Sequence, residues 1–107
     1  MDVDLIKSEL QNFLDSCGKL IRYPAKHRLK IYALAYLASK FEKDIMYTER
    51  EVNELLKGWH CFSDWAMLRR ELYNKKFLNR QKDDSEYWLE EMQPVIENLY
   101  PDLQKKK

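Results

Sequence analysis

Glycine, proline and cysteine are scarce in this chain of 107 residues, with two, three and two copies respectively. Because tight turns depend on glycine and proline, their scarcity disfavours an all-β sandwich and favours helices. Cys17 and Cys61 lie far apart and lack a CxxC spacing, so we interpret them as free thiols in a reducing cytoplasm. No apolar run reaches the length of a membrane span, and the acidic first residues predict no signal peptide.

A strong excess of one charge is also missing. The chain has 19 basic and 18 acidic residues, for a net charge of +1, whereas a small dedicated nucleic-acid binder is usually more basic. Its 45% hydrophobic and 35% charged residues are typical of a soluble globular protein rather than a disordered one. The length is that of one domain, which can fold without disulfides or metal.

Motifs that carry catalysis are absent as well. We find no glycine-rich phosphate loop, no G-x-S-x-G nucleophile and no paired carboxylates. His60 and Cys61 are adjacent, but no second pair completes a zinc site, and neighbouring residues do not easily form a thiol–imidazole pair. We interpret them as a helix-end histidine and a packed cysteine. The sequence therefore predicts no enzyme, no cofactor and no metal.

Hydrophobic periodicity predicts two helices in the first half of the chain. The first covers residues 3–17, with Gly18 as the residue that ends it. The second begins at Pro24, since proline suits the first helical turn, and continues to Phe41. This second helix is apolar on most sides, which is typical of a central helix that is packed on more than one side.

Two further helices follow with recognisable start signals. Thr48 and Glu51 form the T-x-x-E capping box directly before a periodic apolar run, which predicts a helix over residues 49–59. Ser63 is a favourable N-cap for a helix over residues 64–76. The expected core face of that helix consists of Trp65, Leu68 and Leu72.

The remaining elements are short strands and a final helix. Residues 46–48 predict a short strand, and residues 78–82 and 86–89 predict a hairpin with its tip at residues 83–85. Residues 92–99 have the apolar spacing of a terminal helix.

This order predicts a mainly α fold with a small β-hairpin, namely a winged helix-turn-helix core flanked by N- and C-terminal helices. We divide the chain into an N-terminal helix and connector (residues 1–23), a winged-helix domain (residues 24–89), and a C-terminal helix with a basic tail (residues 90–107). The apolar faces of residues 3–17 and 92–99 need partners. Two alternatives stay open: these segments pack on their own domain, or they form the interface of a homodimer across a two-fold axis.

Positive charge gathers in one part of this core. From Arg69 to Lys82 there are six basic residues and one acid, Glu71. We therefore predict that the helix over residues 64–76 binds duplex DNA in the major groove. A solvated basic face is the alternative, and we expect one of the two adjacent arginines to be structural without deciding which. The candidate DNA-binding residues are Arg69, Arg70, Tyr73, Lys75, Lys76, Arg80 and Lys82.

Four segments resemble a bacterial domain family of unknown function: YTEREVNELLKGWH, LRREL, FLNR and SEYW. Its members have the pattern YT-x-x-E-V-N-x-x-L, L-R-R-x-L, G-x-L-x-R and D-G-S-x-Y-W, and they occur alone or fused to helix-turn-helix regulators of the arsenic-repressor type. The resemblance extends from Leu20 to Leu89. It implies a winged-helix fold and a role in transcriptional regulation.

The chain departs from that pattern at two places. Lys76 and Phe77 stand where the pattern has the glycine before L-x-R, so the helix end lacks its usual capping glycine. Asp84 replaces the glycine of D-G-S and brings negative charge to the wing tip, which disfavours phosphate contacts there. Together with the near-zero net charge, Asp84 favours an alternative function: a winged-helix module that binds no DNA and serves in protein interaction or ligand sensing.

Overall fold

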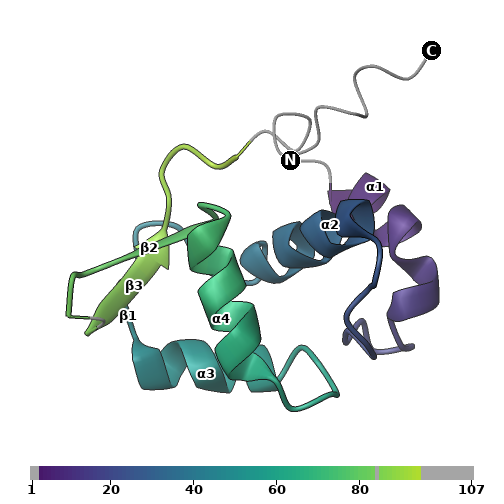
Figure 1. Cartoon of the computed structure of the whole chain (residues 1–107), viewed down its shortest axis with the longest axis horizontal. Helices are drawn as coiled ribbons and strands as arrows, with labels where there is room; N and C mark the ends of the chain where they lie inside the picture. Colours follow the sequence, from purple (N-terminus) through teal and green to yellow (C-terminus); the bar gives the residue numbers. More distant parts are fainter. Residues whose placement is uncertain (1–2, 84, 95–107) are drawn as a thin grey trace.

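A computed structural model describes residues 3–83 and 85–94 of the chain. This part contains four α-helices, a short 3-10 helix and a small antiparallel sheet of three strands, so the fold is mixed α/β (Figure 1). In chain order the elements are α1 (Val3–Glu9), η1 (Gln11–Phe13), α2 (His27–Ala38), β1 (Tyr47–Thr48), α3 (Glu49–Lys57), α4 (Trp65–Asn74), β2 (Leu78–Arg80) and β3 (Glu86–Leu89).

The predicted hairpin and its third strand are confirmed. The strand order is β1-β3-β2, and both pairs are antiparallel, with Tyr47 and Arg80 each opposite Tyr87. Since residues opposite each other share a face of a sheet, Arg80 lies on the same face as the buried Tyr87. Trp88, one residue further along β3, lies on the other face.

Helix α2 is the centre of the core, as its all-round apolar sequence predicted. Its residues from Ile31 to Ala38 are all buried, and α1 and α4 both pack against it (Figure 1). The helix begins at His27 rather than at Pro24, because Lys26 is still extended. It ends at Ala38, and Phe41 reaches the core from the turn that follows.

The first helix is much shorter than predicted. It ends at Glu9, and the expected residues up to Cys17 instead form a 3-10 turn and a loop. Asp15 stabilises the turn in this loop, since its carboxylate accepts hydrogen bonds from the backbone N–H groups of Cys17 and Lys19, both at 2.9 Å. Such side-chain bonds compete with the helix, and Gly18 supplies the left-handed residue of the resulting turn (φ +85°) rather than a helix cap.

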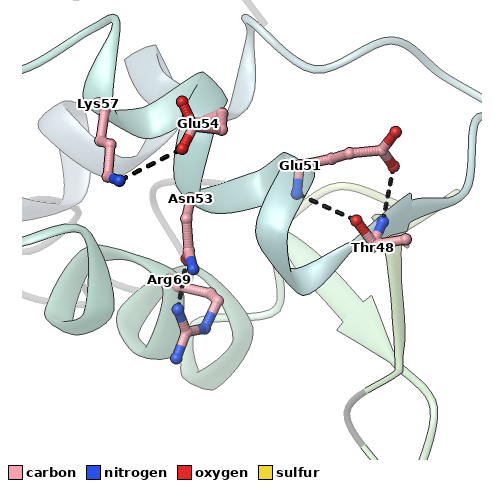
Figure 2. A network of polar contacts seen from close by, with 6 residues as sticks. All are labelled: Thr48, Glu51, Asn53, Glu54, Lys57 and Arg69. Carbon is pink, nitrogen blue, oxygen red and sulfur yellow. Dashed lines mark hydrogen bonds and ion pairs between the residues drawn. The ribbon is translucent and has the colours of Figure 1, made fainter.

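The capping box at the start of α3 is present as predicted. The Thr48 hydroxyl accepts the Glu51 backbone N–H at 3.1 Å, and the Glu51 carboxylate accepts the Thr48 backbone N–H at 2.8 Å (Figure 2). This reciprocal pair satisfies two backbone donors that the first helical turn leaves open. It therefore determines where β1 ends and α3 begins.

Helix α4 begins differently from the prediction. Asp64 is the N-cap residue but makes no side-chain cap bond, and Ser63 adopts a left-handed conformation (φ +55°). The buried His60 ring determines this turn, since its Nε2 accepts the Asp64 backbone N–H at 2.9 Å while Nδ1 faces the Leu56 carbonyl oxygen. Cys61, predicted to be packed, is exposed.

Lys76 ends α4 in the conformation that a glycine usually takes there. Its φ is +71°, and its backbone N–H donates to the Tyr73 carbonyl at 3.1 Å. The next N–H, that of Phe77, donates to the Leu72 carbonyl at 2.9 Å, and both of these side chains are fully buried. These two bonds and the apolar contact define a Schellman motif, which directs the chain from α4 into β2.

The predicted terminal helix, residues 92–99, lies largely outside the described residues, and residues 92–94 are not helical. In the other predicted dimer segment, residues 3–17, Ile6 and Leu10 are buried in the core of the same chain, where α1 packs on α2. Their burial removes part of the apolar surface that motivated the dimer, which stays a prediction.

Candidate nucleic-acid interface

One line of side chains on α4 points away from the protein. Leu68 and Leu72 are fully buried, whereas Ala66, Arg70 and Asn74 are all exposed. These three occupy positions i, i+4 and i+8, which align along one face of a helix. We call Ala66, Arg70 and Asn74 the outward stripe. It contains one cation, one amide and no carboxylate, and neither Ala66 nor Asn74 was identified from the sequence.

Arg69 has a different environment from its neighbour Arg70. Its guanidinium donates to the side-chain amide oxygen of Asn53 on α3 (Figure 2). A second guanidinium nitrogen lies 3.7 Å from the Glu49 carboxylate. The Arg69 side chain is only 19% exposed. These contacts connect α4 to α3, so Arg69 is the structural arginine of the pair.

Arg70 stays on the surface. Its side chain is exposed on the outward stripe, and it forms no ion pair with any residue in the described part of the chain. Because an exposed, unneutralised guanidinium keeps its hydrogen-bond donors available, Arg70 is the better placed of the two arginines to contact an external ligand.

A cleft lies between α4 and the hairpin. Its volume is about 140 Å³, and the described residues that line it include three arginines and no aspartate or glutamate. We call it the arginine cleft. The residues that line it are Ala66, Arg69, Arg70, Tyr73, Arg80 and Tyr87.

Arg80 enters this cleft from the sheet. Its guanidinium carbon lies 4.1 Å from the centre of the Tyr73 ring on α4, a distance suited to a cation–π contact. Tyr87, directly opposite Arg80 in the sheet, is 2% exposed and forms the base of the cleft. The sequence analysis missed Tyr87, although strand alternation places Arg80 and the core residue Leu78 on one face and therefore contained the signal.

The three predicted lysines do not line the cleft. Lys75 and Lys76 follow the end of α4, where Lys75 is half-buried and Lys76 is exposed, and the Lys76 ammonium is 6.0 Å from the Tyr73 ring. Lys82 is exposed between β2 and β3. The structure thus brings Arg69, Arg70, Tyr73 and Arg80 together and places Lys75, Lys76 and Lys82 at either end of β2.

The hairpin tip carries negative charge. Hydrogen bonds from the Ser85 side chain and backbone hold the pKa of the Asp83 carboxyl below its usual range, so this exposed group is ionised at neutral pH. The carboxylate lies next to Lys82 in the chain, and its charge opposes that of the lysine. The Asp83 carboxylate therefore makes the hairpin tip less favourable for an anion than Lys82 alone would make it.

Other kinds of site find little support in the described residues. No group of three or more histidine, cysteine, aspartate or glutamate side chains is arranged to hold a metal ion there. Cys17 and Cys61 are both free and exposed. None of the helices in this part of the chain has the length and apolar character needed to cross a membrane.

Residues 19–89 match a bacterial protein family described as "Uncharacterized protein conserved in bacteria (DUF2087)", and the chain belongs to this family. The match covers α2, α3, α4 and the whole sheet, and it begins after α1. Neither the comparison with curated proteins nor the comparison with solved structures gives a match.

Proposed function

We propose that this DUF2087 chain is a winged-helix regulator that binds duplex DNA through α4. The proposal is supported by the element order, in which α3 and α4 are joined by a short turn and followed by a hairpin whose sheet also contains β1. In the helix-turn-helix arrangement the second helix enters the major groove. The observation that carries the proposal is the outward stripe of α4, which is exposed, basic and free of carboxylates.

The three residues of the outward stripe suit different contacts. Ala66 has a small side chain, which lets the first turn of α4 approach the bases closely. Arg70 can form a bidentate contact with a guanine edge or a phosphate, and Asn74 can pair with an adenine edge. A good bidentate contact discriminates against the wrong base by about 1–3 kcal/mol. In this proposal Arg70 and Asn74 supply sequence readout.

The surrounding cations supply affinity that does not depend on sequence. Lys75 and Lys76 at the end of α4 neutralise phosphates of one strand, and each neutralised phosphate releases condensed counterions. The near-zero net charge of the chain does not oppose this, because the charge is unevenly distributed: the segment from Arg69 to Lys82 has six cations and one acid.

The test is fluorescence anisotropy of a labelled mixed-sequence duplex, titrated with the protein over a salt series. We expect log K to fall linearly with log salt, and Arg70→Gln to make the slope shallower by about 0.9 if Arg70 contacts a phosphate. If Arg70 reads a base instead, the variant lowers affinity for the preferred sequence and leaves most of the slope.

The matched control is Arg22→Gln. Arg22 is an exposed arginine in the connector before α2, where its guanidinium carbon lies 4.5 Å from the centre of the Phe13 ring, and it belongs neither to the outward stripe nor to the lining of the arginine cleft. Its replacement removes the same charge and should leave duplex binding unchanged. Absence of salt-sensitive binding to any duplex at low ionic strength would refute DNA binding and favour the alternative role in protein interaction or ligand sensing.

A further inference from the structure

We propose that a second groove, beside the end of β3, binds a small hydrophobic cation of the aromatic ammonium class. The groove is lined by Lys43, Asp44 and Met46 from the loop before β1 and by residues 88–91 at the end of β3. We call it the tryptophan groove. It shares no lining residue with the arginine cleft, and the inference does not depend on DNA binding.

Part of the groove is apolar and open to solvent. Trp88 lies on the face of the sheet opposite to the buried Tyr87, and both Trp88 and Leu89 are half-buried. Met46 is 48% exposed, and its unbranched side chain adapts to ligands of different shape. A ligand that covers these side chains removes apolar surface from water, which favours binding.

Trp88 differs from the other two tryptophans of the chain. The Lys40 ammonium lies 4.1 Å from the centre of the Trp59 ring, and the Lys57 ammonium lies 4.4 Å from the centre of the Trp65 ring. Among the described residues, no cation lies over the Trp88 ring and no other ring contacts it. Because indole attracts cations more strongly than other aromatic side chains do, Trp88 can take a cation from solution.

The charge of the groove gives the sign of its ligand. The carboxylates of Asp44, Glu90 and Glu91 line it, against the single ammonium of Lys43. Within residues 3–83 and 85–94, none of these four side chains forms an ion pair. The groove therefore attracts a cation and repels a phosphate or carboxylate ligand.

The size of the groove suits a small molecule. Its volume of about 450 Å³ lies within the range of about 300–1,000 Å³ that is usual for small-molecule sites. An aromatic ammonium compound presents an apolar ring to Met46 and Leu89 and a positive charge to Trp88 and the carboxylates. An inorganic cation lacks the apolar part, and a neutral aromatic compound lacks the charge.

The first arm of the test follows the indole Nε1–Hε1 signals of the three tryptophans by NMR. The probe is benzyltrimethylammonium, whose charge does not change with pH, and Trp88→Phe assigns the Trp88 signal. We expect a saturable shift of the Trp88 signal, while the signals of Trp59 and Trp65, whose rings already contact lysines, stay in place.

Two reference ligands at equal ionic strength separate charge from apolar contact. Phenylmethanesulfonate has the same ring with a negative charge, and tetramethylammonium has the cation without the ring. We expect no saturable shift with phenylmethanesulfonate and a weaker one with tetramethylammonium.

The second arm measures the affinity for benzyltrimethylammonium by calorimetry. Asp44→Asn and Glu91→Gln each remove one exposed carboxylate and should weaken binding by up to about fivefold, the range of one exposed charge pair. Trp88→Leu keeps an apolar side chain but removes the ring, and should weaken binding by about five- to thirtyfold. The matched control is Asp4→Asn, on the exposed surface of α1 and outside the groove lining, which should leave affinity unchanged. Thermal unfolding of each variant confirms that the fold is kept.

Four outcomes would overturn the proposal. These are equal affinity for the cation and for phenylmethanesulfonate, unchanged affinity in both Asp44→Asn and Glu91→Gln, absence of any shift of the Trp88 signal, and a Trp88 signal that moves on dilution without ligand. The last would assign the groove to a second copy of the chain. Each of them leaves the duplex-binding measurement unaffected, so the two proposals fail separately.

Discussion

The Arg69 guanidinium on α4 donates a hydrogen bond to the side-chain amide oxygen of Asn53 on α3. The two residues are 16 positions apart in the chain, and their contact links the two helices of the candidate interface (Figure 2). Asn53 therefore determines which of the two adjacent arginines is structural, and it leaves Arg70 on the surface.

From this contact we expect Arg69→Ala to lower the free energy of unfolding by about 1.5–3 kcal/mol, the typical range for a hydrogen bond to a charged group. Arg70→Ala, the adjacent control on the exposed face, should change it by no more than about 0.5 kcal/mol. Urea denaturation of both variants, with Asn53→Ala and the Arg69→Ala/Asn53→Ala double variant, measures the coupling. Equal losses for Arg69→Ala and Arg70→Ala would contradict the structural role of Arg69.

Lys76 provides a second prediction, because its left-handed backbone (φ +71°) is strained for any residue with a side chain. Lys76→Gly should raise the free energy of unfolding by up to about 1 kcal/mol, since the left-handed region costs a non-glycine residue roughly 1–2 kcal/mol. Lys75→Gly is the matched control: the same change at φ −91° should destabilise the protein. Chemical denaturation of both variants measures the change in the free energy of unfolding. If Lys76→Gly destabilises the protein as Lys75→Gly does, the left-handed backbone at Lys76 is not strained.

His60 should be essential to the turn between α3 and α4. The hydrogen bonds of its ring, to the Leu56 carbonyl and from the Asp64 N–H, fit a neutral imidazole with its proton on Nδ1. His60→Phe keeps an aromatic ring of similar shape but loses both bonds, so we expect a loss of about 1–3 kcal/mol. Thermal unfolding would contradict the prediction if His60→Phe were as stable as the unsubstituted protein.

Tyr23 carries a buried hydroxyl without a hydrogen-bond partner among the described residues. Tyr23→Phe removes a desolvation cost and should stabilise the protein by about 1 kcal/mol at neutral pH. Tyr36→Phe is the same chemical change with the opposite expectation, because the Tyr36 hydroxyl donates to the Gly18 carbonyl at 2.7 Å. Urea denaturation at neutral pH compares them, and destabilisation of Tyr23→Phe would count against an unpartnered hydroxyl.

The same residue predicts a pH dependence. Burial, and then the negative charge of Glu71, raise the pKa of Tyr23 above its ordinary value of 10.0. The folded state thus keeps this proton more tightly than the unfolded state does, so the associated stability is complete below pH 10.0 and is lost as the pH rises above it. Tyr23→Phe should lessen the fall in unfolding free energy between neutral and strongly alkaline pH, and an unchanged fall would contradict the assignment.

Much of this architecture was predictable because its signals are local. The T-x-x-E capping box at Thr48 involves residues within one helical turn, and the hairpin depends on alternation and on turn residues next to each other in the chain. Apolar side chains lie on most faces of α2, so the helix removes them from water only if it is buried on several sides. In each case the residues that determine the element are close together in sequence, so their chemistry can be read without knowing the fold.

Tertiary structure decided the rest, since it depended on partners distant in sequence. Periodicity predicted that the first helix continues to Cys17. In the structure the Asp15 carboxylate instead stabilises a turn, and the buried Leu20 forms β-bridges with Leu14 and His60. The sequence alone determined that positive charge gathers between Arg69 and Lys82. Only the packing of the elements determined how these cations are arranged. Arg69 on α4 donates to Asn53 on α3, and Arg80 on β2 lies over the Tyr73 ring on α4, so each contact depends on two separate elements.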